Sequence, residues 1–241
     1  MQDSVTTNLD PTTTASETKE LALFDLDHTL LDVDSDYLWG EYIVKHGLVD
    51  EAQYQTANQR FYEEYIAGTL DATEYNEFVA EFLTTQPMER LHELREHYIQ
   101  TEIEPHIRPK ALSALKHHLE AGHDVVIISA TNDFVVSAIA QRFGIEAAYV
   151  LATPLEIQDN RYTGKLTDKP NFQGGKIYHL EKWVAKQQAQ GITYSRTYGY
   201  SDSKNDLPLL EWADVPVCVT PDDTLHAHAL AHRWAVEDWS I

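Results

Sequence analysis

Two aspartates follow a short apolar run near the start of the chain. Residues 21–24 (LALF) are apolar, and residues 25–29 (DLDHT) place Asp25 and Asp27 directly after them. The apolar run predicts a buried strand, and ligands of open parallel sheets bind beyond the carboxyl ends of the strands. Carboxylates this close repel each other, so they need a shared proton or a cation such as Mg²⁺, which prefers oxygen ligands. The pair therefore favours a functional site over a solvated acidic turn.

Three later segments carry residue types that could act together with these acids. Residues 125–131 (VVIISAT) form an apolar run ending in Ser129, whose hydroxyl and the following N–H groups could hold a phosphate at a helix start. Residues 174–176 (GGK) open a predicted helix and supply a cation. Residues 199–206 (GYSDSKND) follow a predicted strand and place two more aspartates in a loop that opens a helix. Each segment is a weak signal alone, but their order across successive strands makes the set specific.

The elements that must position these residues are read from the alternation of strand and helix patterns after residue 105. The predicted strands are residues 21–24, 124–129, 147–152, 197–201 and 215–219. The predicted helices are residues 110–121, 133–143, 177–190, 207–212 and 225–232, and residues 155–166 predict a hairpin. We therefore expect an α/β fold, with a Rossmann-like parallel sheet core and helices on both of its faces.

Residues 36–104 interrupt this alternation with helical spacing and hold 11 of the 25 aromatic residues. Gly and Pro residues divide the segment into about four helices. We expect a helical domain over these residues, 36–104, inserted after the first strand into a core domain of residues 19–35 and 105–241. Residues 1–18 are rich in Thr, Ser and Asp, and we expect a disordered tail there.

The charge balance excludes some classes of partner. Lys and Arg total 18 against 39 Asp and Glu, a formal net charge of −21. Nucleic acid and anionic membranes need a basic face, so we expect neither as a partner. The single cysteine, Cys218, allows no intrachain disulfide, no leader pattern precedes the first strand, and no apolar run approaches the roughly 18 residues of a membrane span. We therefore expect a cytoplasmic protein.

Taken in order, the four segments resemble the motifs of haloacid dehalogenase (HAD) superfamily phosphatases, in the phosphoserine-phosphatase-like subfamily IB. The matching runs are DLDHTL (25–30), IISAT (127–131), GGK (174–176) and YSDSKNDLPLL (200–210). The helical segment between the first two motifs stands where this family has its cap. The resemblance implies a Mg²⁺-dependent phosphomonoesterase that forms an aspartyl-phosphate, acts on a small-molecule phosphate ester, and is a monomer or a homodimer.

The resemblance also implies a role for each matching residue. Asp25 would be the nucleophile, and Asp27 the general acid and then the general base. Mg²⁺ would be held by the Asp25 carboxylate, the Asp27 backbone carbonyl and Asp202. The phosphate would be held by Leu26, Ser129, Ala130, Lys176 and Asn205, with Lys176 also pairing with Asp25. Thr29 would brace the loop and Asp206 would orient the metal site. An acid at position 27 favours phosphoryl transfer over carbon–halogen cleavage.

Substrate choice is expected to depend on Asp34, Ser35 and Arg60. Asp34 stands nine residues after Asp25, where phosphoserine phosphatases have an acid that helps bind the substrate ammonium, and Arg60 is the candidate for a carboxylate contact. The motifs look closest to a group that includes histidinol-phosphate phosphatases. An acidic, aromatic-rich cap suits an amine and a ring, so L-histidinol phosphate is the leading substrate and phosphoserine the alternative. A non-catalytic phosphate-ester sensor is the third hypothesis, but the eroded motif acids expected of it are not found.

Overall fold

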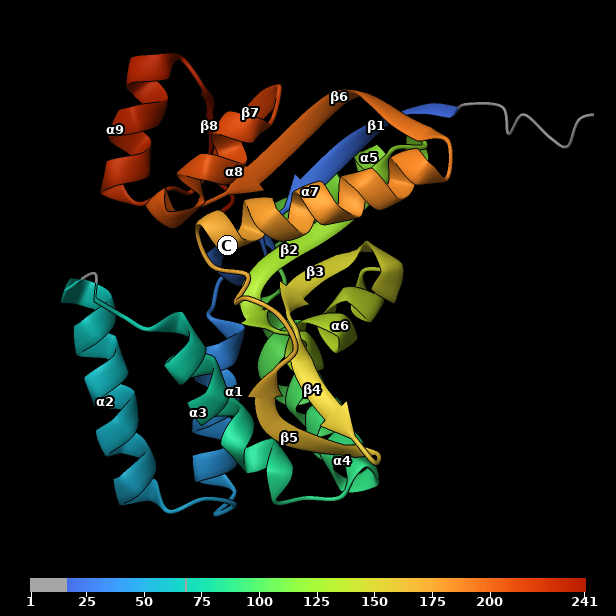
Figure 1. Cartoon of the computed structure of the whole chain (residues 1–241). Coiled ribbons are helices and arrows are strands. Elements are labelled where there is room, and N and C mark those ends of the chain that lie inside the picture. Colours follow the sequence, from blue (N-terminus) through green and yellow to red (C-terminus); the bar gives the residue numbers. More distant parts are fainter. Residues whose placement is uncertain (1–16, 68) are drawn as a thin grey trace, which may run out of the picture.

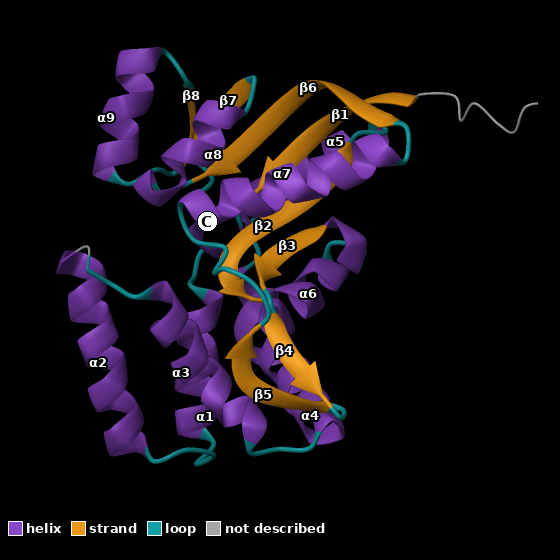
Figure 2. Cartoon of the chain, in the orientation of Figure 1, coloured by secondary structure: helices purple, strands orange, loops and turns teal. Residues whose placement is uncertain are grey.

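A six-stranded parallel sheet runs through the molecule in the order β3-β2-β1-β6-β7-β8 (Figures 1 and 2). The computed structural model describes residues 17–67 and 69–241. The strands of the sheet are β1 (Glu17–Phe24), β2 (Asp124–Asn132), β3 (Val150–Thr153), β6 (Ile192–Ser201), β7 (Val215–Val219) and β8 (Ala235–Glu237). The expected fold class is confirmed, since a parallel sheet lies between helices on both faces.

Successive residues of β1 point to opposite faces of the sheet. Both faces therefore carry apolar side chains, and helices cover both. Ala22 and Phe24 belong to the core under α5 (Pro109–Glu120) and α6 (Asp133–Arg142). Leu21 and Leu23 pack in the core under α7 (Gly174–Ala189) and α8 (Leu207–Trp212). Helix α9 (Asp223–His232) packs against β7 and β8 at the other end of the sheet from β3. A strand buried on both sides has no alternation of polar residues, which explains the continuous apolar run at residues 21–24.

Between β1 and α5, the described residues form four α-helices, which we call the helical insert: α1 (Ser35–Lys45), α2 (Glu51–Ala67), α3 (Ala72–Thr84) and α4 (Met88–Tyr98). A separate antiparallel hairpin, β4 (Leu155–Gln158) with β5 (Arg161–Leu166), packs against α3 (Figure 1). Lys165 Nζ of β5 pairs with Glu77 Oε2 of α3 at 2.8 Å. The β4–β5 hairpin, although it follows β3 in the chain, thus packs against the helical insert.

The chain leaves the sheet for the insert and returns from it at adjacent points. Leu31 and Ile107 form an antiparallel bridge. The Arg108 N–H donates to the Leu30 carbonyl at 3.0 Å, and Arg108 Nε donates to the Leu31 carbonyl at 3.0 Å. Arg108 is buried, so hydrogen bonds of a buried residue hold the two ends of the insert together.

Short helical turns complete the connections: η1 (Leu26–Leu30), η2 (Ile99–Ile103), η3 (Glu104–His106), η4 (Ala147–Tyr149) and η5 (Lys204–Asp206). Of the predicted tail, residues 1–16 lie outside the described residues. Glu17 and Thr18 are not tail, because they pair with Ile192 and Thr193 at the start of β6. Strand β8 is exposed along its length and follows no apolar run, which is why the sequence did not predict it. No helix within residues 17–67 and 69–241 has the length and apolar character needed to cross a membrane.

Candidate active site

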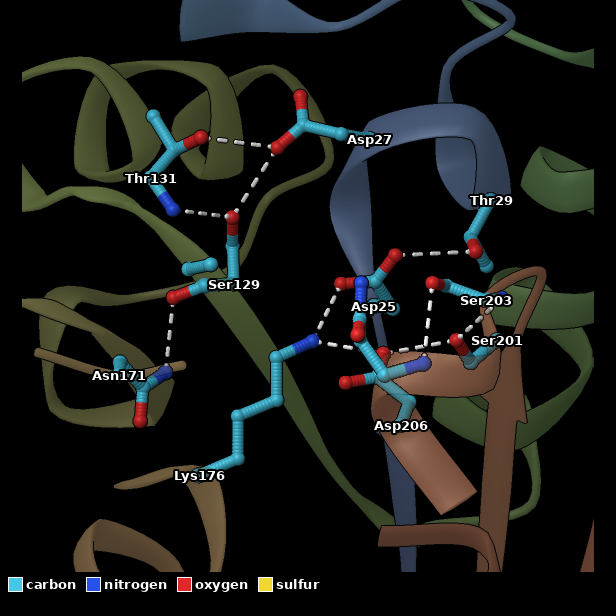
Figure 3. Close-up of polar contacts among 12 residues, drawn as sticks. Asp25, Asp27, Thr29, Ser129, Thr131, Asn171, Lys176, Ser201, Ser203 and Asp206 are labelled. Carbon is cyan, nitrogen blue, oxygen red and sulfur yellow. Dashed lines mark hydrogen bonds and ion pairs between the residues drawn. The ribbon is translucent and has the colours of Figure 1, made fainter. Parts of the chain in front are cut away.

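Lys176 links two aspartates at the carboxyl end of the sheet (Figure 3). Its Nζ donates to Asp25 Oδ1 and to Asp206 Oδ2, both at 2.7 Å, and all three side chains are buried. Lys176 sits in the first turn of α7, where a Cβ on Gly175 would lie 2.0 Å from the Pro170 carbonyl oxygen. Only glycine allows this close approach, so the GGK sequence places the lysine against the end of β1.

The turn after β1 folds Thr29 back over Asp25. Leu26 and Leu30 are buried, and the Leu31 N–H donates to the Leu26 carbonyl at 3.0 Å. His28, with a φ of 56°, gives the turn its left-handed residue. The Thr29 hydroxyl consequently lies 3.1 Å from Asp25 Oδ2 and 3.1 Å from Asp202 Oδ1. One hydroxyl therefore joins the carboxylates that follow β1 and β6.

The loop after β6 holds Asp206 from the other side. The Ser201 hydroxyl donates to Asp206 Oδ2 at 2.7 Å, and the Ser203 N–H donates to Ser201 Oγ at 3.2 Å. The Asp25 N–H donates to the Tyr200 carbonyl at 3.0 Å, which ties the end of β1 to the end of β6. Asp206 is thus held by both Lys176 and Ser201.

Asp27 points toward the end of β2 instead of toward Lys176 (Figure 3). Its Oδ2 accepts hydrogen bonds from Ser129 Oγ at 3.2 Å and from Thr131 Oγ1 at 2.9 Å. Its Oδ1 accepts a hydrogen bond from the Ser35 N–H, at the start of α1, at 2.7 Å. The second acid therefore lies between the sheet and the helical insert, where it contacts both.

A buried asparagine supports the end of β2. Asn171 Nδ2 donates to the carbonyl oxygens of Ser129 and Leu151, both at 2.8 Å. The Thr153 hydroxyl donates to the Ala130 carbonyl at 2.7 Å and accepts from the Asn171 N–H at 2.9 Å. These contacts join the carboxyl ends of β2 and β3 next to the site. They hold the Ser129 hydroxyl beside Asp27.

Negative charge exceeds positive charge at this site. Burial and the neighbouring carboxylates raise the pKa of Asp25 well above its usual value, although Lys176 opposes the shift. Burial raises the pKa of Asp202 to about 6. Burial alone would lower the pKa of Lys176, but Asp206 and Asp25 outweigh it and the pKa is raised. A group of carboxylates around one ammonium ion favours the binding of a further cation.

The described residues match one known family. Haloacid dehalogenase-like hydrolases match over residues 22–211, which is most of the chain. The chain belongs to this family. A histidinol-phosphatase of Neisseria meningitidis serogroup C (strain 8013) is 39% identical over 219 residues, covering 90% of this chain and 98% of the relative. The hydrolase class and the HAD resemblance expected from the four motifs are confirmed.

Solved structures of other proteins share the architecture. A protein of unknown function from Bordetella pertussis Tohama I superimposes with a TM-score of 0.86 at 36% identity, covering 92% of this chain and 100% of that one. A substrate-bound phosphoserine phosphatase superimposes with a TM-score of 0.62 at 20% identity, covering 92% of this chain and 93% of its own. The second likeness establishes a shared fold.

The oxygen donors of this HAD site fit Mg²⁺. Within residues 17–67 and 69–241, no three His, Cys, Asp or Glu side chains are grouped to hold a metal ion. The expected set has two carboxylates, Asp25 and Asp202, which converge on the Thr29 hydroxyl, and a backbone carbonyl. Mg²⁺ is commonly bound through one or two carboxylates and keeps several waters. The short supply of positive charge at the site agrees with such an ion.

The structure brings most of the expected site residues to this edge of the sheet. Asn205 lies beside it, where its Oδ1 accepts a hydrogen bond from Gln173 Nε2 at 3.2 Å. Asp34 is exposed at the start of α1, where its Oδ1 accepts hydrogen bonds from the N–H groups of Asp36 and Tyr37, both at 2.9 Å. Ser35 is buried and contacts Asp27 through its backbone.

Arg60 has a different environment from the one expected of a substrate contact. Its guanidinium pairs with Glu64 Oε1 at 3.3 Å and Glu74 Oε1 at 2.7 Å on the exposed side of α2 and α3. Within the described residues, none of its hydrogen bonds or ion pairs reaches the aspartates of the site. The expectation that Arg60 contacts the substrate is not supported by this position.

Three residues that form hydrogen bonds in the site were not assigned a role from the sequence: Thr131, Asn171 and Ser201. Thr131 and Ser201 stand inside the motif runs, each one or two residues from a candidate, so their positions at the strand ends carried a signal. Asn171 stands in a loop with no periodicity, and nothing local distinguishes it from any other loop asparagine. Its contact with Ser129 depends on how the loop returns to the sheet.

Proposed function

We propose that this HAD hydrolase is a Mg²⁺-dependent phosphomonoesterase of the cytoplasm that acts on L-histidinol phosphate through an aspartyl-phosphate on Asp25. One observation carries the chemical part. Asp25 is buried, and both of its carboxylate oxygens accept hydrogen bonds, from Lys176 at 2.7 Å and from Thr29 at 3.1 Å. A second acid, Asp27, follows two residues later and accepts a hydrogen bond from Ser129. A fixed carboxylate beside a separate acid is the arrangement that two-step phosphoryl transfer needs.

The residues divide the reaction between them. A carboxylate oxygen of Asp25 attacks phosphorus, the ester P–O bond breaks, and Asp27 gives its proton to the leaving alkoxide. Asp27 then takes a proton from water, whose oxygen attacks phosphorus, so that phosphate leaves and the Asp25 carboxylate is restored. Lys176 and the Ser129 hydroxyl stabilise the charge on the transferring group.

A bound Mg²⁺ would neutralise part of the phosphate charge and lower the repulsion between the phosphate and the carboxylates. The Asp25 and Asp202 carboxylates and the Asp27 carbonyl would hold it, with Asp206 beside them on Lys176. Thr29 keeps the two carboxylates at a common distance from its hydroxyl.

Two findings support an amine-bearing substrate. The named histidinol-phosphatase relative aligns over nearly its whole length. Asp34 and Asp27 place two acids at the junction of site and insert, which suits a cation, whereas the guanidinium of Arg60 is occupied by two glutamates. A carboxylate-bearing substrate such as phosphoserine would need a basic partner.

A phosphate-release panel tests the proposal. We expect L-histidinol phosphate to give the highest kcat/KM among histidinol phosphate, phosphoserine, phosphothreonine and sugar phosphates, with turnover lost in EDTA and restored by Mg²⁺. A higher kcat/KM for phosphoserine would overturn the substrate assignment but leave the phosphatase chemistry intact. No release from any ester would instead support the non-catalytic sensor.

A single substitution tests the covalent step. Asp25→Asn should lower turnover by at least about 10³-fold, because the amide is a poor nucleophile, while the fold persists. Trapping of a phosphorylated protein with wild type but not with the variant would identify Asp25 as the acceptor. Activity of the variant near the wild-type level would overturn the aspartyl-phosphate route.

A further inference from the structure

Asp27 is held by donors from two different parts of the fold. Thr131 Oγ1 and Ser129 Oγ reach it from β2, and the Ser35 N–H reaches it from α1 of the helical insert. The position of the Asp27 carboxyl group therefore depends on how α1 and the end of β2 lie relative to each other. A displacement of either segment would move at least one donor.

A side-chain hydrogen bond joins those two segments next to the donors. Asp36 follows Ser35 and Asn132 follows Thr131, and Asn132 Nδ2 donates to Asp36 Oδ1 at 3.1 Å. The other end of the Asn132 side chain is fixed as well, because its Oδ1 accepts a hydrogen bond from the Val135 N–H at 3.2 Å. Both side chains are buried, so solvent does not compete for this bond.

Packing alone does not explain an acid at position 36. Oδ2 of Asp36 is buried and forms no hydrogen bond that meets ordinary geometry within the described residues. Burial raises the pKa of Asp36 to about 8, with Asp34 adding to the shift and the Tyr75 hydroxyl opposing it. The Tyr75 hydroxyl of α3 therefore also approaches the Asp36 carboxyl. An apolar residue at position 36 would avoid the cost of a buried oxygen that lacks a hydrogen bond of ordinary geometry, but it would lose the contacts with both Asn132 and Tyr75.

We propose that the Asp36–Asn132 hydrogen bond positions Asp27 for proton transfer, which makes Asp36 and Asn132 positioning residues of the reaction. The inference rests on the proposed function, in which Asp27 protonates the leaving alcohol. Neither residue contacts the reacting atoms. They act by keeping Ser35 and Thr131 at the distances from which both oxygens of Asp27 are held.

The test compares two leaving groups. An alkyl ester, L-histidinol phosphate or the best ester of the panel, needs a proton on its leaving oxygen, whereas p-nitrophenyl phosphate releases a stable phenolate without one. Asp36→Ala removes the acceptor. Asn132→Ser removes the donor but keeps a hydroxyl that can cap α6. Asp36→Asn keeps an acceptor oxygen and the side-chain size.

We compare kcat/KM, which reports the steps up to release of the alcohol, because hydrolysis of the aspartyl-phosphate with Asp27 as base is common to both esters. We expect Asp36→Ala and Asn132→Ser each to lower kcat/KM for the alkyl ester by about 10-fold or more, since general acid catalysis contributes on the order of 10²–10⁴-fold. The kcat/KM for p-nitrophenyl phosphate should stay within about twofold, and Asp36→Asn should keep most of the alkyl-ester activity. The double variant should lose no more than the larger single loss, because both changes break one bond.

Asn76→Ala is the matched control. Asn76, on α3, is another buried polar residue whose side-chain oxygen lacks a hydrogen bond within the described residues. Its Nδ2 donates to the Ala72 carbonyl of the same helix, and not to Asp27 or its donors. It should leave the ratio of the two rates unchanged. Equal losses of kcat/KM for both esters in the Asp36 and Asn132 variants, or no loss, would overturn the positioning role.

Asp27→Asn separates the two proposals. If this variant loses the alkyl ester selectively but the Asp36 and Asn132 variants do not, the positioning role is wrong and the acid role of Asp27 stands. If Asp27→Asn lowers kcat/KM equally for both esters, the acid role fails and the positioning role fails with it.

Discussion

The end of the sheet and the helical insert are built from different kinds of contact. At the sheet end, buried charged groups hold one another, with Lys176 between Asp25 and Asp206. In the insert, the interior is aromatic, and its charged pairs, such as Arg60 with Glu74, lie on the exposed surface. Trp39 illustrates the insert: it is fully buried against rings from α1, α3, α4 and α6.

This difference separates a region held by buried charges from one held by packed rings. A fully satisfied buried network of charges is rigid, because each member has few alternative partners. An aromatic interior under an exposed polar surface tolerates changes at the surface without loss of packing. Substitutions in the two regions should therefore fail in different ways.

The largest effect is expected at Lys176. Lys176→Met keeps the length of the side chain but removes the ammonium that neutralises Asp25 and Asp206. We expect kcat/KM to fall by at least about 10³-fold and the free energy of unfolding to fall by about 3 kcal/mol. Steady-state kinetics and urea unfolding measure the two effects.

Lys182→Met is the control for Lys176 on the same helix. Lys182 pairs with Asp168 at the surface, and its side chain is 56% exposed. Loss of an exposed pair of this kind should change neither the activity nor the unfolding midpoint measurably. Similar losses in both variants would show that the charge on α7, and not the buried contact, matters.

Trp39→Ala should damage stability more than any exposed change in the insert. The substitution leaves a large cavity among Tyr42, Phe82, Tyr98 and Phe134, so we expect the free energy of unfolding to fall by about 3 kcal/mol or more. Chemical denaturation gives the value. Tyr37→Ala, at a 51% exposed site on the same helix, should stay within about 0.5 kcal/mol, and an equal loss there would contradict the expectation.

Asp36 gives a smaller, pH-dependent effect where the two regions meet. Burial raises its folded-state pKa from 3.8 to about 8, so the folded protein holds this proton more tightly than the unfolded chain. Stability from this residue is greatest below pH 4 and declines as the pH rises toward 8.

Asp36→Asn removes that titration. The free energy of unfolding of the variant should gain on wild type progressively between pH 4 and 8, and the difference should be level above that range. Urea unfolding of both proteins across the range, in the absence of added metal, tests the sign. A difference independent of pH would mean that Asp36 is ionised in the folded protein.

The smallest effect is expected at Arg60. Its two partners are exposed glutamates, so Arg60→Ala should change kcat/KM for histidinol phosphate by less than about twofold. A large rise in KM for phosphoserine alone would restore Arg60 as a carboxylate contact and weaken the contrast between the two regions.

The fold was largely predictable because its strands are marked by apolar runs. Residues 21–24 and 125–128 lie on strands buried on both faces, and each run ends at an acid or a hydroxyl of the site. The start of β1 was not predictable, because Glu17 and Thr18 are exposed and owe their strand conformation to pairing with β6. Propensity carries little information where an edge position is set by a partner strand.

The candidate site was predictable in its sequence-local part. Asp25, Asp27 and Thr29 share one turn, whose geometry follows from buried leucines on either side. The contacts from Asn171 and Asn132 were not predictable, because each joins segments that are distant in the chain and neither stands in a periodic pattern. Their partners are set by how the loops return to the sheet.

The junction between Leu31 and Ile107 has an evolutionary consequence. Because the chain departs and returns at paired positions held by Arg108, the ends of the insert stay close together whatever lies between them. Lengthening a segment whose ends are already joined adds little to the entropy of closing it. The helices could thus be exchanged for others in related lineages without altering the register of β1 and β2, and a new substrate range could arise while the phosphate chemistry is inherited intact.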